Sequence, residues 1–194
     1  MKIVGTEPDV VETVLCAGGF SCPNCPGVLR PWGHGIERDV RVGGVIDRRR
    51  LRRSICRRCR STHVLVPEDL FARRRDTAEV IGSALVAKAA GGGHRSIALS
   101  LGLPFSTVRG WLRRFGAMAT RIFEHFTRWA HVIDPGRGPV EATGSAFVDA
   151  LGAVGMVAQM AVRRFGPRRA WSTASVLTGG LLLCNTSAPW APPI

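Results

Sequence analysis

Two short cysteine pairs are the residues with the clearest chemistry in this chain. Cys22-Pro-Asn-Cys25 and Cys56-Arg-Arg-Cys59 share one spacing, and thirty residues separate the two pairs. A gap of two residues lets a single tight turn present two sulfur atoms to the same ion, so two such turns supply the four thiolates of a tetrahedral site. The pattern predicts one structural Zn²⁺ ion bound by Cys22, Cys25, Cys56 and Cys59.

A pair of disulfides or a redox dithiol would be another use of these cysteines. The N-terminal residues lack the apolar core of a signal peptide, so we expect a cytoplasmic chain whose thiols stay reduced. A redox pair is expected at the strand-to-helix step of a βαβ unit, which this sequence does not show. Cys16 could be a spare ligand, but a buried free thiol fits it better, and Cys184 lies in an apolar run typical of a core. We expect His63 to be a surface residue rather than a fifth ligand.

The sequence around the cysteines predicts a small β structure over residues 22–66. Strand-like segments with β-branched residues lie at 28–32, 36–42 and 62–66, and glycines interrupt them. Metal-binding turns that alternate with strands are the plan of a zinc ribbon. Such a unit is too small for a self-sufficient core, so we expect the metal to supply much of its stability. Residues 1–21 form a lead-in that could carry a further strand.

The chain is strongly basic. Its 194 residues carry a formal net charge of +13, from 25 Arg and two Lys against 14 acids. Such an excess indicates a polyanionic partner, with nucleic acid first and an anionic membrane second. Arginines crowd residues 48–60, where no acid interrupts them, and we expect them to contact phosphate; a solvated face is the alternative. The predicted phosphate-binding residues of this run are Arg48, Arg49, Arg50, Arg52, Arg53, Arg57 and Arg58.

A basic linker at 67–75 leads to a predicted helix-turn-helix domain at 76–116. Asp76 and Glu79 match a capping box that would open its first helix. The sequence Leu-Gly-Leu-Pro at 101–104 then marks a tight turn between a second and a third short helix. An ordinary three-helix bundle with a solvated basic face is the alternative, and the tight turn argues against it.

The predicted third helix separates apolar from polar side chains. Its apolar face holds Val108, Trp111, Leu112 and Phe115 at helical spacing. A recognition helix needs this arrangement, because short polar residues and arginines must point toward the major groove while the other face packs on the domain. The predicted base-contacting residues are Ser106, Thr107, Arg109, Gly110 and Arg113. Arg95 and Arg114 are expected to add phosphate contacts.

The C-terminal part is predicted to be helical. An amphipathic helix is expected at 117–134, a Pro- and Gly-rich break follows, and 140–184 carry largely apolar helices. Asp149 and Gln159 interrupt the longest apolar stretch, so we expect buried helices or a homodimer interface and no membrane span. The tail at 185–194 is expected to be disordered. The predicted fold class is therefore α+β: a small N-terminal β zinc ribbon, an all-α helix-turn-helix domain and C-terminal helices.

No catalytic constellation is visible in the sequence. The histidines lie in separate contexts, without an acid, Ser or Cys partner at a recognisable spacing. The absence of Tyr excludes tyrosine-recombinase and tyrosine-topoisomerase chemistry. After residue 139 only Glu141 and Asp149 supply side-chain carboxylates. We therefore expect a protein that is not an enzyme.

The chain resembles the zinc-ribbon plus helix-turn-helix proteins that are associated with bacterial mobile elements. The resemblance covers residues 16–116 and rests on the two cysteine pairs, on 62–67, and on 95–98 together with 106–114. The last of these segments is similar to the homeodomain-like segments of transposases, which implies DNA binding. In transposases a ribonuclease-H-like domain with three catalytic acids follows such a region, and this sequence does not show one.

These features predict a sequence-specific DNA-binding protein of the nucleoid, acting as a transposon accessory factor or a transcriptional regulator. The alternative is a non-catalytic fragment or subunit of a transposase or recombinase that another polypeptide complements. A zinc-stabilised interaction module that binds RNA is a third hypothesis. The expected partners are double-stranded DNA and a transposase or integrase subunit.

Overall fold

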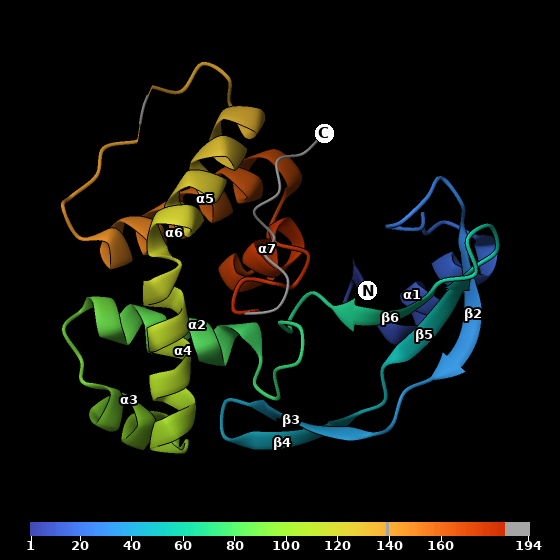
Figure 1. Cartoon of the computed structure of the whole chain (residues 1–194), viewed down its shortest axis with the longest axis horizontal. Helices are drawn as coiled ribbons and strands as arrows, with labels where there is room; N and C mark the ends of the chain where they lie inside the picture. The colour runs from blue at the N-terminus through green and yellow to red at the C-terminus, as the bar shows by residue number, and fades with distance from the viewer. Residues whose placement is uncertain (139, 185–194) are drawn as a thin grey trace.

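The computed structural model describes residues 1–138 and 140–184, so the tail predicted to be disordered at 185–194 lies outside the described residues. The strands are β1 (Lys2–Val4), β2 (Leu29–His34), β3 (Arg38–Val42), β4 (Val45–Arg49), β5 (Arg52–Cys56) and β6 (Thr62–Pro67). The helices are α1 (Pro8–Ala17), α2 (Ala78–Ala89), α3 (His94–Leu101), α4 (Phe105–Ala117), α5 (Ala119–Ile133), α6 (Ala146–Phe165) and α7 (Ala170–Leu177). Strands gather at one end of the molecule and α2–α7 at the other (Figure 1), which confirms an α+β fold with a small N-terminal sheet.

The N-terminal sheet has the strand order β1-β6-β5-β2, with β1 parallel to β6 and the other neighbours antiparallel. Helix α1 packs its buried Leu15 on the sheet residues Leu29 and Leu65. The lead-in at 1–21, which could carry a further strand, holds the strand β1 and the longer helix α1. Pro8 favours a helix start in the first turn, and Gly18, with a φ of 79°, ends the helix in the left-handed region.

A separate two-stranded hairpin, β3–β4, lies between the sheet and the helices (Figure 1). Gly43 and Gly44 form its turn with φ values of 54° and 91°, the left-handed backbone that a two-residue hairpin turn requires. The strand expected at 36–42 is observed as β3, but β4 and β5 were not predicted. In β5, Ser54 and Cys56 alternate inward with the period of a strand, and the surrounding arginines hide that period in the sequence.

The segment predicted as a linker at 67–75 is a packed junction. Leu70 and Phe71 are fully buried within it. The N–H of Ala72 donates to the carbonyl oxygen of Gly180 at 2.8 Å, so the segment is bonded to the chain that follows α7. The strands and the helices are therefore joined by buried contacts rather than by a solvated connection.

Helix α2 begins differently from the prediction. It starts at Ala78, and its N-cap is Thr77, whose hydroxyl accepts the N–H of Val80 at 3.5 Å. Asp76 lies before the helix and accepts two hydrogen bonds from Arg41, at 2.6 and 2.9 Å. The prediction that Asp76 caps α2 was wrong, because a guanidinium far away in sequence binds this carboxylate more strongly than a local N–H does.

Helices α2, α3 and α4 pack around one core. Gly102, with a φ of 63°, ends α3, and Pro104 precedes the first residue of α4. The core side chains that they bury are Ile81, Leu85, Ile97, Val108, Trp111 and Phe115. The helical backbone is interrupted at Met118, whose φ is −111° and ψ is 4°, so α4 and α5 are two separate helices.

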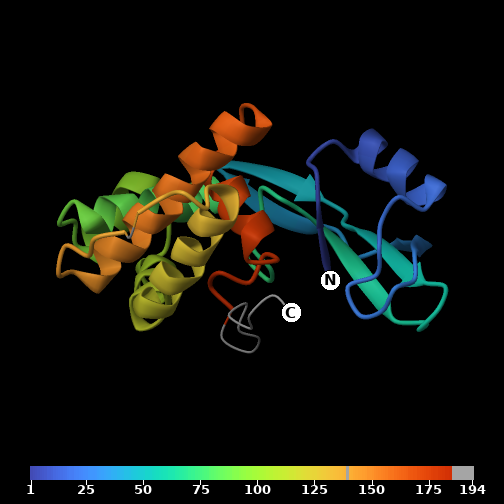
Figure 2. The ribbon, with the colours of Figure 1, turned by 90° about the horizontal axis from the view of Figure 1, so that it is seen from above.

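Helices α5 and α6 lie against each other over much of their length (Figure 2). Among the described residues, α6 is the one helix that is long and apolar enough to cross a membrane by length and composition, and 39% of that stretch is buried inside the structure. Its buried side chains are Ala150, Ala153, Val154, Val157, Ala158, Met160 and Ala161.

Gly82 lets α7 approach α2, because a Cβ at this position would overlap the indole of Trp171. Gly82→Ala is expected to destabilise the fold by about 1–3 kcal/mol through this overlap. Gly152→Ala is the matched control, since nothing lies within 4 Å of a Cβ there, and the gain in helix propensity should stabilise α6 by about 0.5–1 kcal/mol. Chemical denaturation of both variants measures the two effects, and a shift of the same sign in both would contradict the packing of Trp171 on Gly82.

Candidate metal centre and basic surfaces

The four cysteines lie on two turns that the N-terminal sheet brings together. Cys22 and Cys25 lie between α1 and β2, whereas Cys56 ends β5 and Cys59 lies in the turn before β6. Strand β2 pairs with β5 in a register that sets Leu29 opposite Cys56. The two turns therefore meet at the same end of the sheet.

Backbone hydrogen bonds shape both turns. The N–H of Cys22 donates to the oxygen of Gly27 at 2.8 Å, and the N–H of Cys56 donates to the oxygen of Ser61 at 2.9 Å. Gly27 must lack a side chain, because a Cβ there would lie 2.8 Å from the sulfur of Cys56. The glycine that closes the first turn thus leaves the space that the sulfur cluster occupies.

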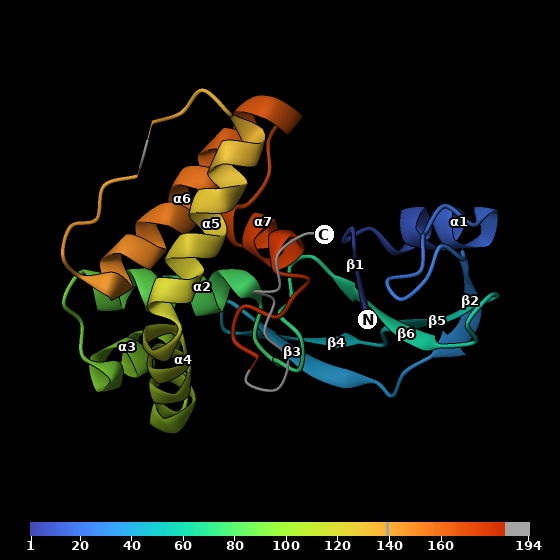
Figure 3. The same ribbon diagram turned by 45° about the horizontal axis from the view of Figure 1, so that its top comes forward.

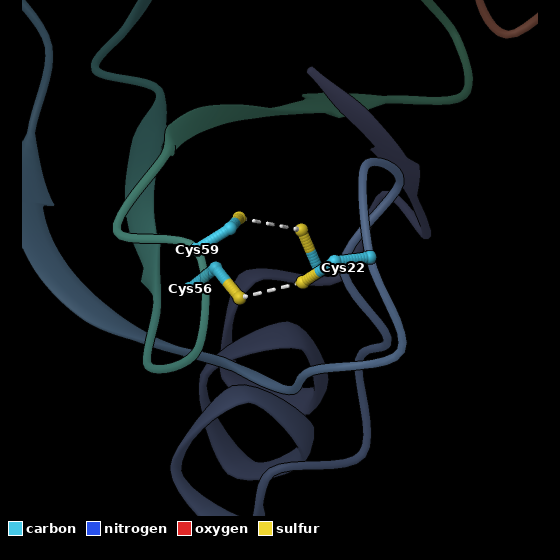
Figure 4. Close-up of side chains that lie close together, drawn as sticks. Cys22, Cys56 and Cys59 are labelled. Carbon is cyan, nitrogen blue, oxygen red and sulfur yellow. Dashed lines mark hydrogen bonds between the residues drawn. The ribbon is translucent and has the colours of Figure 1, made fainter.

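The four sulfur atoms form a compact cluster, and all lie within 4.8 Å of one another. The Sγ atoms of Cys22 and Cys59 are 3.7 Å apart and those of Cys25 and Cys56 are 3.5 Å apart. Figure 4 shows that Cys22, Cys56 and Cys59 point toward a common centre. A tetrahedral ion with metal–sulfur bonds of about 2.3 Å spaces its sulfurs by about 3.8 Å, so the cluster fits one metal ion. No disulfide joins the four cysteines of the cluster.

The environment of the second turn favours thiolates. The pKa of Cys59 is lowered to about 6, because the hydroxyl and the N–H of Ser61 donate to its sulfur. The backbone N–H groups of Cys59 and Arg58 lower the pKa of Cys56. In the first turn, burial and the neighbouring thiol of Cys56 raise the pKa of Cys25 to about 11. Holding all four groups as thiolates requires a positive charge at the centre of the cluster, and a bound metal ion would supply it.

His63 is a buried neighbour of the cluster, so its assignment as a surface residue was wrong. Its side chain is 3% exposed, and Nε2 lies 3.5 Å from the sulfur of Cys22. The nitrogen of Met1 lies 3.0 Å from Nδ1. Since that nitrogen is a donor, Nδ1 accepts and Nε2 carries the hydrogen that points to the sulfur. The period of two in β6 could have revealed this, because buried Leu65 lies on the same face.

Cys16 takes no part in the cluster. It is exposed, and its sulfur lies 3.5 Å from Oε1 of Glu12 on the same helix. The expectation of a buried thiol was wrong, because Leu15 occupies the position of α1 that faces the sheet. Cys184, expected in the core, is half-buried.

Two of the predicted phosphate-binding arginines are engaged with acids. Arg49 forms ion pairs with Asp47 and Asp69, each at 2.7 Å, and Arg52 forms one with Glu12 at 2.6 Å. The side chains of Arg49 and Arg52 are only 22% and 16% exposed. No acid interrupts residues 48–60, but Asp47 directly precedes them, and the fold brings Glu12 and Asp69 to them from distant elements.

The remaining arginines of the predicted set differ in exposure. Those that are exposed are Arg48, Arg50, Arg57, Arg58 and Arg95, and those that are half-buried are Arg53 and Arg114. Arg48 lies 3.8 Å from Asp39, a pair in which both side chains are largely exposed and which therefore contributes little. Arg57 and Arg58 lie on the second cysteine turn, so two of the exposed arginines of this stretch are close to the sulfur cluster in the chain.

Helix α4 presents the predicted base-contacting residues away from its core. Ser106, Arg109 and Arg113 are exposed, while Thr107 and Gly110 are half-buried. Val108, Trp111, Leu112 and Phe115 are buried on the opposite side. No ion pair within the described part of the chain joins Arg109 or Arg113 to an acid. The outer face of α4 is therefore cationic and accessible.

The sulfur cluster and α4 lie in different parts of the molecule. The turn between β5 and β6 lies at one end and α4 at the other (Figures 1 and 3). Comparison of the chain with protein families, with curated proteins and with solved structures found no match. What the sulfur cluster and the outer face of α4 can bind is therefore argued from their own residues.

The contact of His63 with Cys22 generates a prediction about metal affinity. His63→Phe removes a donor to a ligating sulfur and should lower the affinity for Co²⁺ or Zn²⁺ by about 10–100-fold. His63→Gln can still donate and should lose less. Competition with a chelator, followed through the thiolate–Co²⁺ absorption, measures the affinities.

Leu65→Ala is the control for this measurement. It removes buried contacts on the same face of β6 and should lower the stability of the fold while changing the metal affinity much less. If His63→Phe and Leu65→Ala reduced the affinity equally, His63 would act through packing and not through its N–H.

Proposed function

We propose that the chain is a zinc-stabilised, sequence-specific DNA-binding protein. In this proposal α2, α3 and α4 form a helix-turn-helix and α4 enters the major groove. The observation that carries it is the division of α4: Val108, Trp111 and Phe115 are buried, while Arg109 and Arg113 are exposed and hold no acid among the described residues.

The shape of the three-helix core supports the proposal. Gly102, Leu103 and Pro104 join α3 to α4 by a turn of three residues, and Leu103 is buried beneath it. In helix-turn-helix proteins the second helix of such a pair lies in the major groove, and its N-terminal residues contact base edges. Ser106 and Arg109 lie in the first two turns of α4, where this geometry needs them.

The proposed metal is zinc in a structural role. Four sulfur ligands complete a tetrahedron and leave no open position for substrate or water, which is typical of structural rather than catalytic zinc sites. The buried residues around the sheet are few, and two of the cysteines, Cys22 and Cys56, are themselves among them. Zinc would therefore stabilise a part of the chain whose apolar core is small.

The proposed phosphate contacts come from the arginines that carry no buried acid. These are Arg48, Arg50, Arg53, Arg57 and Arg58 of the strand part, with Arg95 and Arg114 of the helical part. Arg49 and Arg52 leave the set because their guanidinium groups bind Asp69 and Glu12. Positive charge on both parts suits one duplex that contacts strands and helices together.

The resemblance of residues 16–116 to mobile-element proteins supports a role of this DNA binding in transposition or in its control. We propose an accessory factor or a transcriptional regulator, with a transposase or integrase subunit as the protein partner. A catalytic role is not proposed, because the thiol that contacts an imidazole beside the cluster, that of Cys22 with His63, would be a ligand of the proposed zinc and so not a free nucleophile.

Zinc content tests the metal site. The purified protein should carry about one equivalent of zinc, and Cys56→Ser should lose it together with the structure of the N-terminal sheet, because structural zinc contributes about 10–16 kcal/mol in finger peptides. The helical signal of α2–α7 should persist. Cys16→Ser is the control, since its exposed thiol lies outside the cluster and its loss should leave zinc binding unchanged. Zinc below half an equivalent in the wild type would refute the proposed cofactor.

Salt titrations on two duplexes test the division of roles. Arg109→Ala should weaken binding to a selected site by about 1–3 kcal/mol and weaken binding to a scrambled duplex much less. Arg57→Ala and Arg58→Ala should weaken binding to both duplexes alike and flatten the salt dependence, by about one unit of slope for each phosphate that is no longer neutralised.

Arg52→Ala is the control for these variants. Its ion pair with Glu12 predicts a loss of stability with little change in the slope against salt. Equal losses of Arg109→Ala on both duplexes would mean that α4 does not recognise bases, and the protein would then be a non-specific nucleic-acid binder.

A further inference from the structure

The turn of the β3–β4 hairpin is an exposed apolar tip. Val42 is 37%, Val45 is 66% and Ile46 is 63% exposed, and the two residues at the turn itself are Gly43 and Gly44. The tip is therefore narrow, because the two glycines have no side chains. It is apolar on both strands, through Val42 on β3 and through Val45 and Ile46 on β4. Val45 and Ile46 are therefore mostly uncovered by the described part of the chain, and Val42 is covered in larger part.

Arginine stands directly behind the apolar tip. The register sets Arg41 opposite Ile46 and Asp39 opposite Arg48, and these four residues share the outer face of the hairpin. The side chain of Arg48 is 75% exposed. The guanidinium of Arg41 is held by Asp76, so Arg48 is the arginine of this face that can reach a ligand. Apolar side chains beside an exposed guanidinium suit the minor groove, where apolar wedges enter between base steps while arginine binds the groove and its phosphates.

The turn end of the hairpin is bonded to the start of the helices, because Arg41 directly precedes Val42, which lies opposite Val45 across the turn. Arg41 forms a bidentate ion pair with Asp76, and its backbone N–H donates to the oxygen of Arg75 at 2.6 Å. The N–H of Thr77, the N-cap of α2, donates to the oxygen of Arg41 at 3.1 Å. The hairpin therefore has a fixed direction relative to α2 and to the helices that pack on it. Figures 1 and 3 show it reaching from the strands to the helices.

Arg38, at the base of the same hairpin, has an unmet donor. Its Nε is buried and finds no hydrogen-bond partner among the described residues. Burial, followed by the charges of Arg49 and Arg75, lowers its pKa. Because this nitrogen is enclosed by protein and Arg38 lies on the face opposite to Ile46 and Arg48, it is not part of the surface that would meet DNA.

The acids of the hairpin do not prevent an approach to DNA. Asp47 pairs with Arg49, and Asp39 lies beside Arg48. The same charges, Asp47, Arg48 and Arg49, lie along β4 and disfavour the addition of a strand from another protein molecule. The charge balance therefore favours a polyanion over a second copy of the chain as the partner of the tip.

We propose that the β3–β4 hairpin is a second DNA-binding element, which inserts Val45 and Ile46 into the minor groove of the duplex whose major groove α4 occupies, and bends that duplex. This proposal rests on the proposed function of α4. The hairpin supplies affinity and a bend, and α4 supplies the choice of bases.

The test uses the full chain on a short duplex that carries a site selected from random DNA. Val45→Ser combined with Ile46→Ser removes the wedge without removing charge. Val132→Ser, at a side chain of α5 that is 63% exposed, is the matched control. The measurements are the affinity, the bend angle by fluorescence energy transfer between the duplex ends, and the minor-groove protection from hydroxyl radicals.

The double variant is expected to lose about tenfold in affinity, the bend, and one patch of minor-groove protection, because a wedge is what holds a minor-groove kink. It should keep the preference for the selected over the scrambled duplex. Arg109→Ala should show the opposite pattern, losing the preference and keeping the minor-groove protection. Val132→Ser should match the wild type in every measurement.

Three outcomes would overturn the proposal. If the double variant bends and protects DNA as the wild type does, the hairpin does not contact the groove, and the proposed function of α4 still stands. If sedimentation shows that the double variant dissociates a wild-type dimer, the tip binds a second copy of the chain. If the wild type binds no duplex at all, the proposed function fails and the hairpin proposal fails with it.

Discussion

The ion pair between Arg41 and Asp76 is the interaction on which the arrangement of the molecule depends. It joins the β3–β4 hairpin to the residue that precedes the N-cap of α2, and the Asp76 side chain is only 4% exposed. A buried carboxylate without its guanidinium would cost about 3–5 kcal/mol, and the lower end applies here because Arg41 remains 35% exposed. The Asp76 pairing raises the pKa of Arg41, so the cation persists at every physiological pH. This ion pair fixes the β3–β4 hairpin to the start of the helical part.

Residues from α7 to Leu183 form hydrogen bonds to the segment 67–75, which lies next to this ion pair. The hydroxyl of Ser175 in α7 donates to the oxygen of Leu70 at 2.7 Å, and the guanidinium of Arg74 donates to the oxygen of Leu183. Residues more than 100 positions apart thus satisfy each other's buried polar groups. Residues 67–75 have the composition of a basic linker, but Leu70 and Phe71 are fully buried in them. Leu70 packs in the core with Val40 and Val66, and Phe71 packs in the core of the helices.

Arginine has two different uses in this chain, and burial separates them. Arg41, Arg49 and Arg52 bind Asp76, Asp69 and Glu12 and hold distant elements together. A charged pair of this kind stabilises a unique arrangement, but its guanidinium is not available to a ligand. Arg57, Arg58, Arg109 and Arg113 remain exposed, and under the proposed function they supply the DNA contacts. The strongly positive net charge is thus only partly a property of the binding surface.

The sequence by itself determined the features that depend on local spacing. The two Cys-x-x-Cys turns predicted the sulfur cluster, because neighbouring ligands of one metal must be close in sequence within each turn. The period of 3.6 residues predicted the buried and the exposed faces of α4, because a helix carries its neighbours at fixed offsets. The prediction of an α+β fold followed from these two patterns.

Only the tertiary structure decided which groups meet across long distances. Asp76 looked like a helix cap until the fold brought Arg41 to it. The period of β6 could indicate that His63 is buried, but not that Cys22 is its neighbour. Strand β4 was hidden because four of its five residues are exposed, so that no alternation marks it. In β5 arginines, whose stems can cover apolar surface, mask the period of two. Partners of a polar side chain are set by chain topology rather than by neighbouring residues, and for that reason no pattern within a short stretch of sequence could reveal them.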